Sequence, residues 1–330
     1  MNLKIIALAL WFLLLTPCIQ AHGQQPAKIP TVGYLEGGPE SRHAARIEAF
    51  RQGLRELGYL EGKNIAIEWR FADAKLDRLP ALAAELVRLN VELIVTGGTA
   101  PTRAAKEATS KIPIVMANDN DPVANGIIAS LARPGGTITG LSNYAPELSG
   151  KRLEILKEFV PKLSRVAVLG ISGLSTGRTA ELVMREMEPA AKAIGVNLQY
   201  LDVLDSKDVE AAFRAASKEK AQAVLTVPNA VIVSQRAQIV EFAAKDRLPG
   251  IYHNSQFAEV GGLMFYGVNV LDLDRRTATF VDRILKGAKP SELPVEQPKK
   301  FELVINLKAA NHIGLTIAPN VLARADKIIR

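Results

Sequence analysis

The chain of 330 residues has 41 Lys and Arg against 34 Asp and Glu, a formal net charge of +7, and a single cysteine. Its 48% hydrophobic and 23% charged residues are typical of a folded globular protein, which excludes disordered, collagen-like and disulfide-stapled classes. At about 150 residues per domain the length predicts two domains, and the dispersed positive charges, which form no basic stripe with aromatic residues, predict no nucleic-acid partner.

The amino terminus is typical of an export signal. Lys4 precedes an unbroken apolar run from Ile5 to Leu15, and its eleven residues are too few to cross a bilayer, which takes about 20. We therefore expect residues 1–23 to be a signal peptide cleaved near Gly23, which leaves a periplasmic protein. A lipoprotein site at Cys18 is less favoured, because Pro17 stands where a small residue is expected.

Strand and helix patterns alternate in the first half of the chain. Apolar residues recur at helical spacing, as at Ile47, Phe50 and Leu54, between short apolar runs. The order indicates a parallel sheet covered on both faces. Strands are expected at 31–35, 65–69, 93–96 and 112–117, and helices after Ser41 up to Gly58, after Asp77 up to Leu89, at 101–109 and at 122–132.

The pattern restarts after Arg133-Pro134-Gly135-Gly136, which breaks the chain. Two similar α/β lobes of about 120–150 residues account for this repetition. Strands are expected at 137–141, 165–170, 196–201, 223–227, 250–252, 263–266 and 301–306, and helices at 147–160, 177–194, 207–219, 231–246 and 270–286, with short helices after the last strand. The Pro-rich segment 293–298 is typical of a linker.

Distinctive motifs run through the chain. They are FRQGLRELGY at 50–59, IPIV at 112–115, DPV at 121–123, SLARPGG at 130–136, GGLM at 261–264, LPVEQP at 293–298 and ARAD at 323–326. With these motifs the chain resembles the type I periplasmic substrate-binding proteins of ABC transporters, in the branch that takes up aromatic amino acids such as tryptophan. The resemblance covers nearly all of the chain after the expected signal peptide.

The resemblance implies an α/β fold of two doubly wound parallel-sheet lobes joined by three crossover strands. We place the crossings near Asn143-Tyr144, near Tyr266–Val268 and within Leu293–Gln297. The first lobe is then 29–143 plus 268–293, and the second is 144–267 plus 294–330. The resemblance also implies a non-enzymatic, monomeric solute-binding component that serves separate ABC permease and ATPase subunits and closes on its ligand by a hinge.

Polar loops follow the predicted strands, at the sheet edge where open parallel sheets bind ligands. Gly97-Gly98-Thr99-Ala100-Pro101 is the most informative of them, because a helix start with Thr99 or Ala100 as its cap offers free N–H groups to a carboxylate. Asp121 can pair with a ligand ammonium or can simply cap the helix expected at 122–132. The candidate ligand contacts are Gly37, Gly98, Thr99, Ala100, Asn118, Asp121, Asn143 and Tyr144, followed by Ser172, Asn229, Asn254 and Tyr266 of the second lobe.

Other functions remain open on the sequence alone. Gly173 to Gly177 matches the G-x-S-x-G pattern of serine hydrolases, with Ser175 as nucleophile and His253 or His312 as base. Ser175 stands about five residues past the predicted strand rather than on a sharp elbow, so we favour a capping role for it. A ligand-sensing domain for a receptor is a third possibility. No cofactor or metal is expected, and the ligand can be an aromatic or branched-chain amino acid or an aromatic carboxylate.

Overall fold

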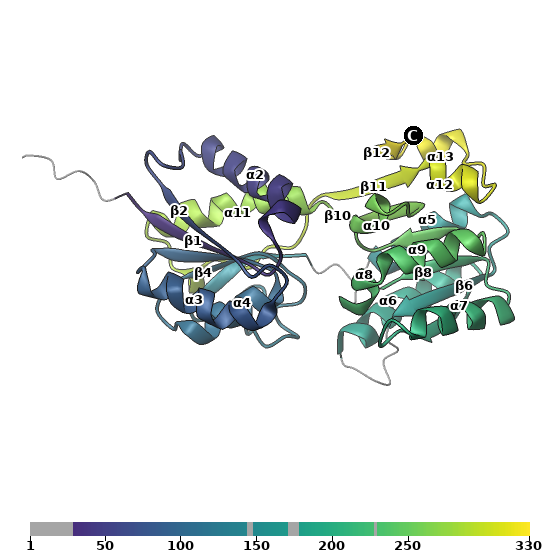
Figure 1. Cartoon of the computed structure of the whole chain (residues 1–330), viewed down its shortest axis with the longest axis horizontal. Helices are drawn as coiled ribbons and strands as arrows, with labels where there is room; N and C mark the ends of the chain where they lie inside the picture. The colour runs from purple at the N-terminus through teal and green to yellow at the C-terminus, as the bar shows by residue number, and fades with distance from the viewer. Residues whose placement is uncertain (1–28, 144–147, 171–177, 228–229) are drawn as a thin grey trace, which may run out of the picture.

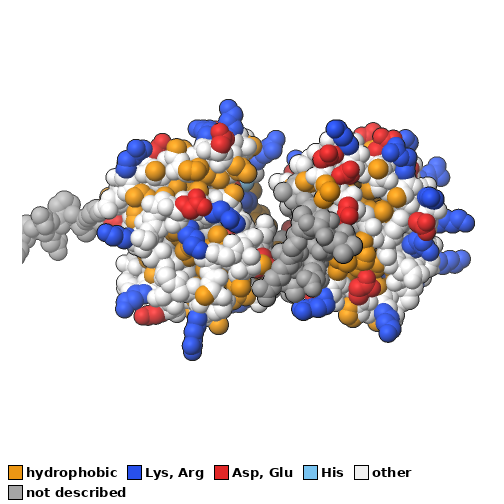
Figure 2. All heavy atoms as spheres, turned by 90° about the horizontal axis from the view of Figure 1, so that it is seen from below, with side chains coloured by type: hydrophobic (Ala, Val, Ile, Leu, Met, Phe, Trp, Pro, Cys, Tyr) orange, Lys and Arg blue, Asp and Glu red, His pale blue; other side chains and the backbone are white. Residues whose placement is uncertain are grey.

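Two α/β lobes lie side by side along the long axis of the molecule (Figure 1). The structure is a computed structural model that describes residues 29–143, 148–170, 178–227 and 230–330. No helix within these ranges combines the length and apolar character needed to cross a membrane. On the face seen in Figure 2, Lys and Arg side chains are spread over both lobes among acidic ones.

The first lobe is built on a five-stranded parallel sheet in the order β2-β1-β3-β4-β5. Successive strand residues point to opposite faces, so Tyr34 packs with Phe50 of α2 on one face while Leu35 packs with Leu82 of α3 on the other. The sheet is therefore covered on both faces, as expected. Its elements are β1 (Thr31–Glu36), α2 (Glu40–Glu56), β2 (Ala66–Phe71), α3 (Leu79–Arg88), β3 (Leu93–Gly97), α4 (Thr99–Ala108), β4 (Ile114–Asp119) and β5 (Ile138–Ser142).

The second lobe has a seven-stranded sheet in the order β12-β11-β10-β9-β8-β6-β7. All of its pairs are parallel except β10 with β11, which is antiparallel. The strands are β6 (Arg165–Gly170), β7 (Asn197–Asp202), β8 (Ala223–Thr226), β9 (Gly250–Tyr252), β10 (Met264–Val268), β11 (Phe301–Asn306) and β12 (Lys327–Ile329). The helices are α5 (Leu148–Phe159), α6 (Arg178–Ala193), α7 (Asp208–Lys218), α8 (Ala230–Ser234), α9 (Arg236–Lys245), α10 (Gln256–Glu259), α12 (Leu307–His312) and α13 (Pro319–Leu322).

The chain passes between the lobes at the end of β10. Strand β10 belongs to the second sheet, but α11 (Val270–Leu285), which follows it, packs on α2 and β4 of the first lobe. The return comes after Glu296, because its N–H donates to the Gly140 carbonyl and its own carbonyl accepts from the Ser142 N–H. Residues up to 296 therefore bond to the first lobe, beyond the boundary at 293 that the sequence indicated.

Several elements differ from the sequence-based prediction. The helix expected at 122–132 is wrong: the segment forms one turn, which Gly126 ends at a φ of +66° with the Ile127 N–H bonded back to Pro122. The helix expected at 231–246 is divided at Gln235 into α8 and α9. Strand β12 and the short helix α10 were not predicted from the sequence.

Candidate functional site

The loops at the carboxyl ends of β3, β4 and β5 come together at one edge of the first sheet. The Thr99 hydroxyl donates to Asp119 Oδ1 over 3.1 Å, and the Asn143 N–H donates to the Asp119 carbonyl over 2.8 Å. Gly37 follows β1 at the same edge, where its N–H donates to the Glu36 carboxylate. Carboxyl ends of parallel strands share one edge, so the chain brings the predicted first-lobe residues into one region.

The start of α4 differs from the expected capping arrangement. Gly98 is the N-cap residue, with a φ of +108° that favours glycine, and no side chain caps the helix. Thr99 is the first helical residue and gives its hydroxyl to Asp119, while Ala100 is exposed. The prediction that Thr99 or Ala100 caps this helix is therefore wrong. Since no side chain satisfies them, the first N–H groups of α4 are open to another acceptor.

Asp121 holds the turn that follows β4. Its side chain is buried, and Oδ1 accepts a hydrogen bond from the Ala124 N–H over 3.0 Å. This is the bond that an N-cap makes, here at the head of one turn rather than of a helix. Asp121 therefore makes a capping bond, although the helix that it was expected to cap is replaced by this turn.

Asp119 is a buried acid that the sequence analysis did not select. Its side chain is fully buried, and no hydrogen-bond partner for Oδ2 is found among the described residues. Burial raises the pKa of Asp119, while the hydroxyl of Thr99 acts in the opposite direction. The sequence did carry a signal, since two polar residues, Asn118 and Asp119, end an otherwise apolar strand.

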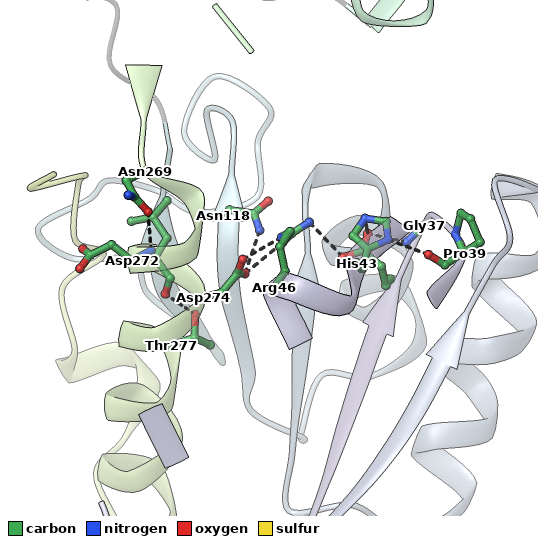
Figure 3. Close-up of polar contacts among 11 residues, drawn as sticks. Gly37, Pro39, His43, Arg46, Asn118, Asn269, Asp272, Asp274 and Thr277 are labelled. Carbon is green, nitrogen blue, oxygen red and sulfur yellow. Dashed lines mark hydrogen bonds and ion pairs between the residues drawn. The ribbon is translucent and has the colours of Figure 1, made fainter. Parts of the chain in front are cut away.

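A buried ion-pair cluster lies beside this edge, formed by residues that are far apart in the sequence (Figure 3). Arg46 of α2 donates two hydrogen bonds to Asp274 of α11, from Nε to Oδ2 at 2.7 Å and from Nη2 to Oδ1 at 3.0 Å. Arg46 Nη1 also lies 3.4 Å from Glu36 Oε2 at the end of β1. Asn118 Nδ2 reaches Asp274 Oδ1 at 3.5 Å, which ties α11 to β4. The cluster therefore fixes the start of α11 on the first lobe.

The guanidinium of Arg46 favours the ionised forms of the two buried acids in this cluster, Glu36 and Asp274. Burial raises the pKa of both Asp274 and Glu36, and the positive charge of Arg46 works against that shift in each case. His43 Nε2, 3.6 Å from Glu36 Oε1, adds to the effect when protonated. Apart from Asn118, no residue of this cluster was selected from the sequence, because the contact between residues 46 and 274 exists only after α11 returns to the first lobe.

The second lobe contributes fewer described candidates. Tyr144, Ser172 and Asn229 lie outside the described residues. Asn254 Oδ1 accepts from the Gln256 N–H at 2.9 Å and so shapes the turn after β9. The Tyr266 carbonyl accepts from Arg152 Nε at 2.7 Å, which places a buried cation beside the crossing. This arginine of α5 was not selected from the sequence.

The residues considered for catalysis are only partly within the described ranges. Ser175 lies outside the described residues. His253 is bound to Thr226, with 3.0 Å between Nδ1 and Oγ1, and burial together with nearby Arg152 holds the pKa of His253 well below its usual range. Within the described ranges, no three His, Cys, Asp or Glu side chains are grouped to hold a metal ion.

Comparison with known proteins finds a matching family model and a curated relative. The family model described as ABC transporter substrate binding protein matches residues 39–329. A curated protein of Clostridioides difficile strain R20291, named tyrosine-binding protein, is 26% identical over 261 residues, which are 78% of this chain and 73% of the relative.

Solved structures share the fold. A conserved domain protein from Vibrio cholerae is 27% identical with a TM-score of 0.77, over 91% of this chain and 100% of that one. An ABC domain in complex with L-Trp from Streptococcus pneumonia is 24% identical with a TM-score of 0.74, over 90% of this chain and 100% of that one. These likenesses confirm the predicted fold class.

Proposed function

The chain belongs to the family of ABC transporter substrate binding proteins, and from this we propose that it is the extracytoplasmic component of an importer that traps an amino-acid-like ligand. The observation that carries the proposal is the gathering of the loops after β3, β4 and β5 beside the crossings between lobes. A relative named for tyrosine and a similar fold solved with L-Trp favour an aromatic amino acid as the ligand. A permease and an ATPase are then the partners.

We assign the ligand carboxylate to the start of α4. The uncapped N–H groups after Gly98 carry the positive end of the helix dipole, which suits an anion. Asp121, two residues beyond β4, supplies the opposite charge for the ammonium. Further contacts are proposed from Gly37, Thr99, Ala100, Asn118 and Asn143 of the first lobe, and from Tyr144, Ser172, Asn229, Asn254 and Tyr266 toward the second.

The two lobes are proposed to act as discontinuous domains. The first consists of 29–143 and 269–296, and the second of 144–268 and 297–330. The boundary expected at 268 moves to the residue after β10, which ends at Val268, and the last boundary is taken from the hydrogen bonds of Glu296. Hinge closure requires that the ligand bind the closed form better than the open one, so contacts from both lobes are needed.

Binding tests the proposal directly. L-tyrosine and L-tryptophan should raise the unfolding temperature of the mature protein, since a ligand at 100 times its Kd stabilises by about 2.7 kcal/mol. A screen in which no amino acid or aromatic carboxylate shifts the transition would contradict the proposal. Labelling of Ser175 by a fluorophosphonate would instead support the hydrolase.

Closure should be visible in solution. We expect small-angle scattering to give a smaller radius of gyration with saturating amino acid than without it, because the lobes rotate about the crossings as rigid bodies. Calorimetry on the same sample confirms occupancy. An unchanged radius at full occupancy would argue against a hinge.

A glycine pair separates backbone strain from ligand contact. Gly98 and Gly126 both have positive φ, and an added Cβ would meet only one atom within 4 Å at Gly98, Asn118 Oδ1 at 3.9 Å, and none at Gly126. Replacing either by alanine should cost about 1 kcal/mol of stability through backbone strain. Only Gly98→Ala should also weaken amino-acid binding, because strain at this residue displaces the first N–H groups of α4. We expect a loss of about tenfold, which is the value of about one hydrogen bond. Equal binding in both variants would remove the α4 start from the site.

A further inference from the structure

A cavity of about 350 Å³ lies in the second lobe, away from the crossings. It is lined by α9, by the starts of β9 and β10, and by α12. Strand β10 runs from Met264 at the cavity end to Val268 at the crossing, four residue steps or about 13 Å. The cavity and the proposed ligand cleft therefore lie at opposite edges of the second sheet.

The wall of the cavity is mostly apolar. Val240 and Leu248 line it from α9 and the turn that follows, Leu263 from the start of β10, and Ile313 from the end of α12. A cavity of this size, apolar with a few polar groups, is at the lower end of the range that small-molecule sites occupy. It suits a compact apolar body rather than a sugar or a nucleotide.

One tyrosine hydroxyl belongs to this wall. Tyr252 lines the cavity with 1% of its surface exposed, and no hydrogen bond of its hydroxyl to another described residue is found. Its ring is fixed by stacking on Phe257, with centroids 4.4 Å apart. A side chain at Gly250 would place its Cβ 2.3 Å from the hydroxyl oxygen, so the hydroxyl has room in this position only because residue 250 is a glycine. Because Tyr252 lines the cavity, an acceptor bound there can take a hydrogen bond from its hydroxyl.

The exposed basic side chains at the mouth of the cavity favour a ligand with a negative charge. Lys308 and His312 of α12 are exposed where they line the cavity, and none of the described residues that line it is acidic. We propose that this cavity is a second small-molecule site, which takes a small apolar monocarboxylate. The apolar body packs on the wall, Lys308 attracts the carboxylate, and the Tyr252 hydroxyl donates a hydrogen bond.

The test uses phenylacetate and its uncharged match phenylacetamide on the mature protein with labelled methyl groups. The methyls of Ile313 and Leu263 report the cavity, and the methyl of Ala100 reports the cleft separately, so failure of one site does not hide the other. Saturable shifts at Ile313 and Leu263 are expected, stronger for phenylacetate than for the amide. No saturable shift at about 10 mM phenylacetate, or no preference for the acid, would overturn the proposal.

Three variants assign the contacts. Ala244→Phe, at a half-buried lining position of α9, fills the cavity and should abolish the shifts at Ile313. Lys308→Gln should weaken phenylacetate two- to fivefold, about the value of an exposed charge pair, and leave phenylacetamide unchanged. Tyr252→Phe should weaken it about three- to tenfold. Shifts that survive Ala244→Phe in a folded protein would overturn the proposal, and if that variant does not fold, an unchanged affinity in both other variants would do so.

Discussion

Replacing Arg46 by methionine is expected to lower the free energy of unfolding by about 3 to 5 kcal/mol, the cost of breaking a buried ion pair. Arg46 makes both hydrogen bonds of the bidentate contact to Asp274, whose side chain has no exposed surface. Its removal leaves the Asp274 and Glu36 carboxylates buried without a guanidinium. Urea denaturation followed by circular dichroism measures the change.

A matched control is available on the same helix. Arg55 of α2 pairs with Glu48 at 2.6 Å, but both side chains are exposed, so Arg55→Met should cost less than about 1 kcal/mol. The double variant Arg46→Met, Asp274→Leu should recover part of the loss, because it removes the uncompensated acid as well. Equal losses for Arg46→Met and Arg55→Met would show that the cluster contributes nothing beyond a surface pair.

The loss at Arg46 should also depend on pH. The pKa of Asp274 is already raised by burial, and without Arg46 it rises further. A group whose pKa is higher in the folded state is stabilising when protonated, and that stability is lost as pH rises through the folded pKa. The difference between wild type and Arg46→Met should therefore shrink as pH falls from about 8 to about 5. A difference that grows in acid would contradict this reasoning.

Replacing Asp121 by asparagine is expected to weaken an amino-acid ligand by about 1.5 to 3 kcal/mol, the usual value of a hydrogen bond to a charged group. Asparagine keeps the side-chain oxygen that accepts from the Ala124 N–H, so the turn after β4 should persist. What is lost is the negative charge opposite the ammonium. Calorimetry with L-tyrosine on both proteins measures the effect.

The deaminated analogue of the same ligand provides the control. 3-(4-Hydroxyphenyl)propionate has the carboxylate but no ammonium, so Asp121→Asn should leave its affinity unchanged or improve it. Asp121→Ala removes the cap as well, and it should lower stability by about 1 kcal/mol where asparagine does not. If both ligands lose equally with asparagine, Asp121 only holds its loop and the ammonium partner lies elsewhere.

The alternation of strands and helices could be predicted because each element carries its own periodic pattern. Tyr34 and Leu35 are neighbours in a buried parallel strand and pack on opposite faces, as the alternation of strands and helices along the chain indicated. Strands β6, β9 and β11 have the predicted bounds. The helix predicted at 122–132 is wrong, and the one turn found there ends at Gly126, which has a positive φ.

The candidate site was predictable only as a set of loops. Position after a strand places Gly98, Asn118 and Asp121 at one sheet edge, and that follows from the topology of parallel sheets. The topology does not determine which side chains form hydrogen bonds with one another. The Thr99 hydroxyl, for example, donates to Asp119 instead of capping its own helix. Capping preferences in the sequence identify the possible hydrogen-bond partners, but tertiary packing determines which of these bonds forms.

The sequence by itself thus determined the class of fold, the two lobes and the edge where polar loops gather, since these depend on hydrophobic period and chain order. Only the tertiary structure decided the buried cluster of Glu36, Arg46 and Asp274 and the cavity beside Tyr252. Both join segments that are distant in the chain, through the return of α11 to the first lobe and of α12 onto the second. Electrostatic coupling depends on distance in space, which one-dimensional patterns do not contain.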